Sequence, residues 1–297
     1  MDFVSLHKGK LYWAIAIFLI FISCGSPREG QSVQSDSLPA KRLLKYWDGF
    51  NFKAKIQAGN PDAVEQKLVD FMGLFPTVPD TVMQIAVHDM LKKASVEPQN
   101  LTFFLDKYNH YLYDPNSPMR NDEYYEPVLT YLAADEKLPQ DERTKHALLL
   151  ELVRKNQVGT LATDFEFLAK DGKYRRMHEG AKPYKMLVFY DPTCAQCEAI
   201  MKDLGYTPAV YNCIENGFLE IVSVSLHPDK ARWTSYQKRI PDNWVNGWDE
   251  KGRVINDGLY NIRAYPTIFL LDESNVVLLK DAPLDVTLRY LVNVVSH

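Results

Sequence analysis

An apolar run leads directly into a pair of cysteines in the stretch Met186-Leu187-Val188-Phe189-Tyr190-Asp191-Pro192-Thr193-Cys194-Ala195-Gln196-Cys197. The first five residues predict a buried strand, and the cysteines follow where that strand is expected to pass into a helix. Two thiols at this spacing can be interconverted with a disulfide. The stretch therefore predicts redox chemistry on thiols.

The two cysteines are expected to have different roles. Cys194 falls at the start of the predicted helix, where unpaired backbone N–H groups and the helix dipole favour a thiolate, which is the attacking species in disulfide exchange. Cys197 lies one turn further in. We therefore predict that Cys194 is the more exposed thiol and attacks, and that Cys197 resolves the mixed disulfide.

The same spacing also supplies half of a structural zinc site. The chain has four cysteines, Cys24, Cys194, Cys197 and Cys213. A four-ligand site would need His178, His227 or a carboxylate to converge on them. Because the sequence offers no second half of such a site, we predict no metal and no cofactor, with structural zinc as the alternative.

A second motif follows about seventy residues later, in Asn261-Ile262-Arg263-Ala264-Tyr265-Pro266-Thr267-Ile268-Phe269-Leu270-Leu271-Asp272. It places a proline at the start of an apolar strand, where the ring removes a ladder donor. Together with the cysteine motif, this segment resembles the thioredoxin superfamily. The resemblance implies that Pro266 is cis beside the two sulfurs and that Thr193, Tyr265 and Pro266 line a substrate groove.

The resemblance extends over residues 157–297. Residues 159–173 look like the added hairpin of the TlpA/ResA-like and peroxiredoxin-like branches, residues 276–280 like the edge strand, and residues 284–295 like the closing helix. The fold that it implies is a thioredoxin-like domain, with a central mixed β-sheet flanked by helices.

The chain departs from that family at three places in the site, which bear on the redox potential and on proton transfer. Thr193 replaces the common Trp, and Ala195-Gln196 replaces Gly-Pro between the cysteines, which leaves the redox potential undetermined. Val188 occupies the position of the buried acidic residue. Glu198 either replaces that carboxylate or only improves the electrostatics of the helix start.

Residues 207–265 add a helix, a strand and a long insertion to this pattern. Cys213 is expected on a helix as a buried, unreactive thiol or as a third redox thiol, and the strand is expected at 218–226. Five aromatic residues fall in the insertion that follows: Trp233, Trp244, Trp248, Tyr236 and Tyr260. We expect most of them to pack an irregular segment against the domain, with one or two lining a substrate surface as the alternative.

The first forty residues predict a location. Lys8 and Lys10 precede the apolar stretch 11–22, which ends at Ser23-Cys24 in a segment that resembles a lipobox. We predict a signal peptide at 1–23, a lipid on Cys24 as the membrane anchor, and a flexible tether at 24–40. The soluble domains would then lie in the periplasm of a bacterial cell envelope. Cleavage without lipid and an uncleaved anchor are the alternatives.

Residues 41–156 carry helical periodicity and no strand pattern. Helices are predicted after Asn60-Pro61 and at 80–94, 99–113, 122–134 and 140–155, joined by short connections that suit an antiparallel bundle. We read the aromatic residues of this region as core. A helical domain before a thioredoxin-like domain resembles a group of envelope lipoproteins whose helical part has no assigned function.

Composition supports an ordinary globular protein of two domains. The chain has 297 residues, of which 46% are hydrophobic and 24% charged, with a formal net charge of −4. Lys and Arg are scattered rather than clustered, which argues against a nucleic-acid partner.

Three function classes follow from these motifs. The first is an envelope-anchored thiol:disulfide oxidoreductase, whose partners would be cysteine-containing envelope proteins and a redox-recycling protein. The second is a thioredoxin-fold protein that binds partners with a vestigial dithiol. The third is a peroxidase-like enzyme, which the paired cysteines disfavour because peroxiredoxin sites use an isolated cysteine.

Overall fold

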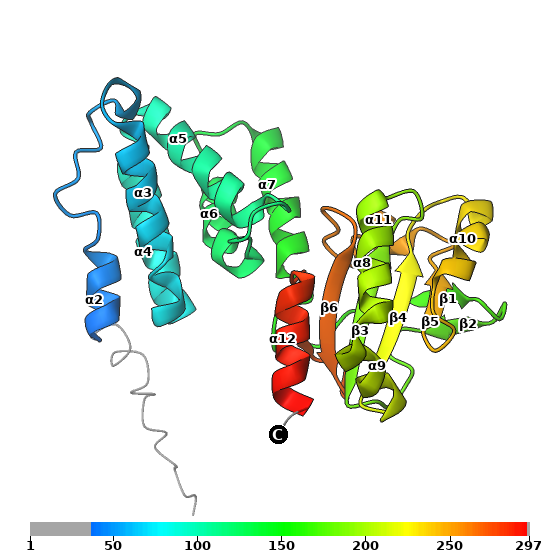
Figure 1. The fold of residues 1–297 in the computed structure, drawn as a ribbon. Coiled ribbons are helices and arrows are strands. Elements are labelled where there is room, and N and C mark those ends of the chain that lie inside the picture. The colour runs from blue at the N-terminus through cyan, green and yellow to red at the C-terminus, as the bar shows by residue number, and fades with distance from the viewer. Residues whose placement is uncertain (1–36, 296–297) are drawn as a thin grey trace, which may run out of the picture.

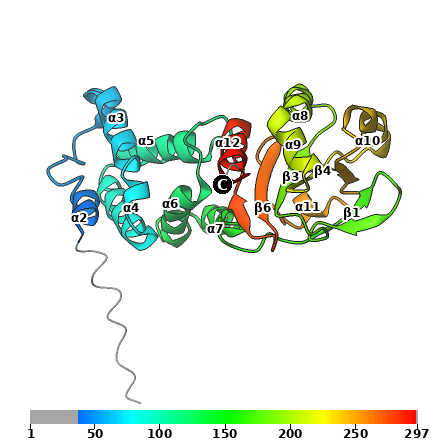
Figure 2. The same ribbon diagram turned by 60° about the horizontal axis from the view of Figure 1, so that its bottom comes forward.

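The structure, a computed structural model, describes residues 37–295. A group of helices comes first along the chain, and a β-sheet with helices on both faces follows (Figure 1). Both views show helix α12 (Leu284–Val295) standing between the two parts (Figures 1 and 2). Between residues 37 and 295, no helix combines the length and the apolar character that a membrane crossing requires. The predicted signal peptide and Cys24 lie outside the described residues.

The N-terminal part is all helical, as predicted. Its elements are α2 (Leu38–Leu44), η1 (Ile56–Ala58), α3 (Pro61–Met72), η2 (Phe75–Thr77), α4 (Asp80–Ala94), α5 (Pro98–Tyr108), the π-helical η3 (Asn109–Tyr113), α6 (Asp122–Ala134) and α7 (Gln140–Arg154). Capping side chains explain where several of these helices begin. The side chains of Asn60 and Asn121 accept hydrogen bonds from the first turns of α3 and α6.

One hydrophobic core holds these helices together. It contains the aromatic residues that the sequence assigned to packing, with Phe104 and Tyr108 fully buried. Trp47 forms edge-to-face contacts with Phe71 and Phe104, at ring-centroid distances of 5.7 and 5.5 Å. The helical part therefore buries an apolar centre of its own.

Two segments of the helical part differ from the prediction by more than one residue. Helix α2 begins at Leu38, so residues 38–40 of the predicted tether are helical: Ser37 caps the helix, and Ala40 and Leu43 are buried in the core. The helix predicted at 99–113 is α-helical only to Tyr108 and continues as a π-helix. The composition of residues 24–40 predicts a tether, but the burial of Ala40 and Leu43 extends the fold into the end of this polar segment.

The second part is built on a seven-stranded mixed sheet in the order β2-β1-β5-β4-β3-β6-β7. The strands are β1 (Glu166–Ala169), β2 (Tyr174–Arg176), β3 (Tyr184–Tyr190), β4 (Leu219–Ser225), β5 (Val245–Trp248), β6 (Thr267–Asp272) and β7 (Val277–Leu279). Strands β3, β4 and β5 run parallel, whereas β6 pairs antiparallel with β3. The predicted hairpin is β1–β2, and the predicted edge strand is β7.

The central strand β3 explains why its sequence reads as a continuous apolar run. Met186, Val188 and Tyr190 belong to the core on one face of the sheet, whereas Leu187 and Phe189 belong to the core on the other. The first core packs beneath α8 (Ala195–Tyr206), α9 (Pro208–Glu215), α10 (Lys230–Tyr236) and α12, and the second beneath α11 (Arg253–Asn256).

The insertion at 227–265 is not irregular, and this expectation was wrong. It contains α10, the short η4 (Gln237–Arg239), α11 and strand β5, which extends the sheet parallel to β4. The sequence Val245-Asn246-Gly247-Trp248 has weak strand propensity, because Asn and Gly are depleted in strands. Gly247 is required there, because a Cβ at this position would collide with the Phe167 ring of the neighbouring strand. The five aromatic residues of the insertion are buried, as expected.

Candidate active site

Cys194 is the N-cap of α8. Its backbone is extended, with φ −84° and ψ 114°, and its Sγ accepts a hydrogen bond from the backbone N–H of Cys197 at 3.2 Å. The thiol is half-buried. The sulfur therefore lies at the first turn of α8, beside the backbone N–H groups that have no partner within the helix.

The loop that leads into α8 is fixed by Asp191. Its Oδ1 accepts hydrogen bonds from the backbone N–H of Thr193 at 2.7 Å and from the Thr193 hydroxyl at 2.6 Å. The carbonyl of Asp191 accepts the N–H of Cys194 at 3.1 Å. This turn places Thr193 at the surface beside the half-buried sulfur.

Cys197 lies one turn further into α8 and is fully buried. Its side chain packs in the same core as Val188 and Met201. Burial raises the pKa of the Cys197 thiol, and the neighbouring Cys194 raises it further. The two thiols therefore differ in the way that the sequence predicted: one is accessible, and the other is kept protonated inside the domain.

The segment before β6 completes the site. The Tyr265–Pro266 peptide bond is cis, as the resemblance implied, and the Cys194 Sγ lies 3.5 Å from the carbonyl oxygen of Tyr265. The Tyr265 side chain is half-buried, and its burial raises the pKa of the phenol to about 12. The structure thus brings Thr193, Cys194, Cys197, Tyr265 and Pro266 together, although Cys194 and Tyr265 are 71 residues apart along the chain.

Val188 occupies the position of the family's buried acid, and Glu198 was the candidate to replace that carboxylate. Val188 is fully buried and apolar. Glu198 forms an ion pair with Arg239 at 2.5 Å, with both side chains more than half exposed. Arg239 therefore holds the Glu198 carboxylate at the surface, and the carboxylate whose charge acts on the Cys197 thiol is that of Asp191.

Two tyrosines lie close to the buried thiol, Tyr190 at the end of β3 and Tyr236 on α10. Tyr190 donates its hydroxyl to Asn246 Oδ1 at 3.1 Å, and its ring lies 5.5 Å from that of Tyr236. Burial raises the pKa of Tyr236 to about 12, and the nearby Cys197 adds to the rise. The position of Tyr190, at the end of the strand that leads to the cysteines, was the available signal.

Cys213 is not part of this site. It lies on α9, which follows the C-terminal end of α8, and only 6% of its surface is exposed. Burial raises the pKa of its thiol. These observations favour the buried, unreactive thiol over a third redox group.

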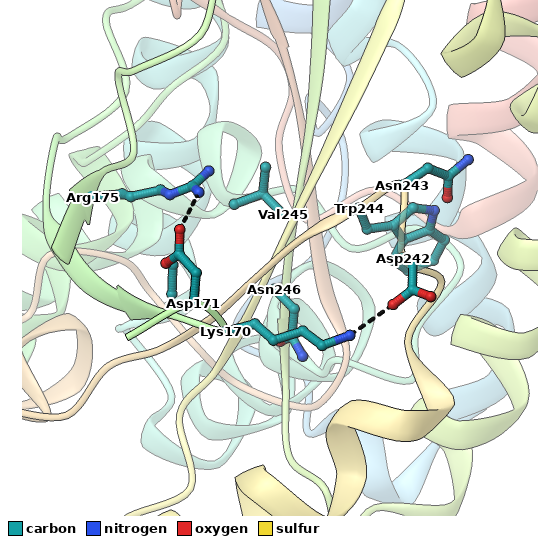
Figure 3. Close-up of a pocket in the computed structure, with 9 residues that line it drawn as sticks. Lys170, Asp171, Arg175, Asp242, Asn243, Trp244, Val245 and Asn246 are labelled. Carbon is teal, nitrogen blue, oxygen red and sulfur yellow. Dashed lines mark hydrogen bonds and ion pairs between the residues drawn. The ribbon is translucent and has the colours of Figure 1, made fainter. Parts of the chain in front are cut away.

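An open depression of about 570 Å³ lies elsewhere, along β5 and the end of β1 (Figure 3). Its charged side chains pair with one another: Lys170 with Asp242 at 2.7 Å, and Arg175 with Asp171 at 2.8 Å. Neither cysteine lines it. Within residues 37–295, no group of three or more His, Cys, Asp or Glu side chains is arranged to hold a metal ion.

The fold and the dithiol define a class. A mixed sheet, a Cys-x-x-Cys pair at the start of a helix and a cis-proline beside the first sulfur are the marks of a thioredoxin-like domain. A family model described as thioredoxin-like matches residues 183–277, and a model for a domain of unknown function matches residues 34–156.

The chain belongs to the thioredoxin-like proteins. The solved structure of a thioredoxin-like protein from Bacteroides caccae is 31% identical, and the match covers 88% of this chain and 95% of that one, with a TM-score of 0.79. Two solved structures from Bacteroides fragilis cover 46% of this chain and 98% of theirs. One is the C-terminal domain of an uncharacterized protein (28% identity, TM-score 0.45), and the other a conserved protein of unknown function (34% identity, TM-score 0.44). No curated protein matches the chain.

Proposed function

We propose that the protein is a thiol:disulfide oxidoreductase that uses Cys194 and Cys197 on cysteine-containing proteins of the cell envelope. The observation that carries the proposal is the asymmetry of the dithiol. Cys194 is accessible and its sulfur accepts an N–H bond, whereas Cys197 is buried with a raised pKa. A nucleophile and a resolving thiol need this difference.

In the reducing direction, the thiolate of Cys194 attacks one sulfur of a substrate disulfide. A bond forms between this sulfur and Cys194, and the second substrate sulfur leaves as a thiolate with the electron pair. Cys197 then loses its proton to a departing thiolate or to water and attacks the Cys194 sulfur. This step forms the Cys194–Cys197 disulfide and releases the first substrate sulfur. Two electrons and two protons pass from the protein to the substrate.

The carbonyl of Tyr265 and the exposed Thr193 flank the sulfur that would attack. An extended substrate segment can pair with the backbone at the cis-proline, next to Cys194, and so align its disulfide for attack. Tyr265 and Pro266 would therefore be binding residues, whereas the cysteines carry the chemistry. A separate redox partner would return the site to its starting state.

The location is part of the same proposal. Lys8 and Lys10, the apolar stretch 11–22 and the Ser23-Cys24 ending favour export and attachment through a lipid on Cys24. An oxidising compartment holds disulfides on which the dithiol can act.

The alternative is a partner-binding protein with a vestigial dithiol, and one assay separates the two. The full chain is mixed with dithiothreitol and insulin, and the precipitation of the reduced insulin B chain is followed. The proposal expects acceleration over dithiothreitol alone, complete loss in Cys194→Ala, and full activity in the matched control Cys213→Ala. An inactive parent protein that folds normally would favour the binding protein.

A further inference from the structure

The helical part reaches the active site through one segment of the chain. Residues 258–263, which lead to Tyr265, are anchored to residues of the helical part or of the connection after it at four points: Gly258, Leu259, Asn261 and Arg263. Lys155 Nζ donates to the carbonyl of Gly258 at 2.7 Å, and Asn156 Nδ2 donates to the carbonyl of Leu259 at 2.8 Å. No proposed step of the redox reaction uses these contacts.

Arg263 is the centre of this anchorage, two residues before Tyr265. Its Nη1 donates to the carbonyl of Tyr113 at 2.6 Å and lies 3.2 Å from Asp122 Oδ1 on α6. Its Nη2 donates to Asp281 Oδ2 at 2.6 Å. The guanidinium also lies over the Tyr113 ring, 4.7 Å from the centroid. A planar fork makes all these contacts at once, which the single ammonium of lysine cannot do.

The charges of this junction are buried. The side chains of Arg263 and Asp122 are 7% and 3% exposed, and Lys280 reaches Asp122 Oδ2 at 3.0 Å from the end of β7. Asn261 adds a hydrogen bond from its Nδ2 to the same oxygen at 3.2 Å. Breaking a buried ion pair leaves an uncompensated charge, so separation of α6 from Arg263 is strongly unfavourable.

We propose that the helical domain positions the cis-proline segment against Cys194, through the Asp122–Arg263 junction. The inference rests on the proposed oxidoreductase function and assigns to the helical domain a part in substrate binding. The contacts run from Asp122 to Arg263, then along two residues of backbone to Tyr265, whose carbonyl lies 3.5 Å from the sulfur. Arg263 is a positioning residue, since it touches neither sulfur nor substrate.

The test is the variant Arg263→Lys in the full chain, with Arg154→Lys as its matched control. Arg154 pairs with Glu126 at 2.7 Å within the helical part, so its ion pair does not involve residues 258–265. Two substrates are compared: insulin, which must dock beside the cis-proline, and a small aromatic disulfide, which needs only the accessible sulfur. Dithiothreitol recharges the dithiol in the insulin assay, whereas the small disulfide is mixed with pre-reduced protein freed of dithiothreitol, because dithiothreitol would reduce it directly.

We expect Arg263→Lys to raise the KM for insulin about tenfold, because a misplaced docking backbone loses substrate alignment. The kcat and the turnover of the small disulfide stay within about twofold of the parent, and Arg154→Lys changes neither substrate. Amide hydrogen exchange of residues 261–267 becomes faster in Arg263→Lys alone. A variant that merely destabilised the fold would lose both substrates in proportion.

Equal effects on the two substrates, or an unchanged KM and unchanged exchange in a folded Arg263→Lys protein, would overturn the inference. If thermal melting shows that Arg263→Lys is unfolded, the variant Tyr113→Phe tests the inference in its place. It removes only the hydroxyl that donates to Asn261 Oδ1 at 3.4 Å, and we expect about a twofold rise in KM with faster exchange at 261–267. An inactive parent would contradict the proposed function, whereas the exchange measurement still tests the positioning.

Discussion

The sulfur of Cys194 lies 3.5 Å from the carbonyl oxygen of Tyr265, 71 residues away along the chain. The pairing of β3 with β6 explains why these two atoms lie close together. Strand β3 ends just before Cys194, and its antiparallel neighbour β6 begins just after Tyr265, with Phe189 opposite Thr267. The end of one strand and the start of the other therefore meet at the same edge of the sheet.

The asymmetry of the dithiol predicts which variant traps substrates. Cys197→Ala should accumulate mixed disulfides, because Cys194 still captures a substrate while the resolving thiol is missing. Cys194→Ala should trap nothing, and Cys213→Ala should behave like the parent. Non-reducing gels of protein incubated with oxidised insulin measure the adducts. Labelling of Cys197 before Cys194 by iodoacetamide at mildly acidic pH would show that the roles are reversed.

The buried thiol also predicts a pH dependence of stability. Burial raises the pKa of Cys197 in the folded protein, so the unfolded chain releases this proton first, near pH 8.5. The free energy of unfolding should then fall as the pH rises, by up to about 1.4 kcal/mol per pH unit. The reduced parent and Cys197→Ala are compared by urea denaturation between about pH 8 and 9.5, below the tyrosine range. Parallel pH profiles would contradict the prediction.

Gly247→Ala should destabilise the protein by about 2 kcal/mol, because the added Cβ meets the Phe167 ring in a packed core. The double variant with Phe167→Leu should recover part of this loss. Gly73→Ala is the matched control: Gly73 has helical φ and ψ, and its Cβ would make ordinary contacts. Urea denaturation measures all three, and equal effects at both glycines would refute the steric argument.

Asn156 has a left-handed backbone conformation and a side chain that makes two hydrogen bonds. Two variants separate the contributions of these features to the free energy of unfolding. Its φ is 54°, its Nδ2 donates to the carbonyl of Leu259, and its Oδ1 accepts the N–H of Thr163 at 2.7 Å. Asn156→Gly accepts the positive φ but removes both hydrogen bonds, and should cost about 2 kcal/mol. Asn156→Ala also opposes the positive φ and should cost about 1 kcal/mol more. A smaller loss in the alanine variant would show that backbone strain is unimportant here.

Attachment through a lipid on Cys24 predicts that a variant without this cysteine leaves the membrane fraction. Cys24→Ser should move the protein from the membrane to the soluble fraction of the envelope, because the serine cannot carry the lipid of a lipoprotein. Immunoblots of fractionated cells measure the shift, with Cys213→Ser as the control. Retention of Cys24→Ser in the membrane would point to another anchor.

Local signals were sufficient for most elements. Helices α4, α6 and α12 have the predicted bounds, because caps and apolar periodicity act within one segment. The cysteine motif and Pro266 marked two sides of the site, since their residue types are distinctive by themselves. The nature of the chemistry and the thioredoxin-like fold followed from these short stretches.

Strand β5 and the Arg263 junction required the tertiary structure. Asn246 and Gly247 have low strand propensity. The strand forms there because it pairs with β4 and because Gly247 leaves room for the Phe167 ring. Arg263 resembles any surface arginine in the sequence. Its burial against Asp122 depends on how two parts of the chain pack, since a single segment encodes neither the partner of a charge nor its removal from water.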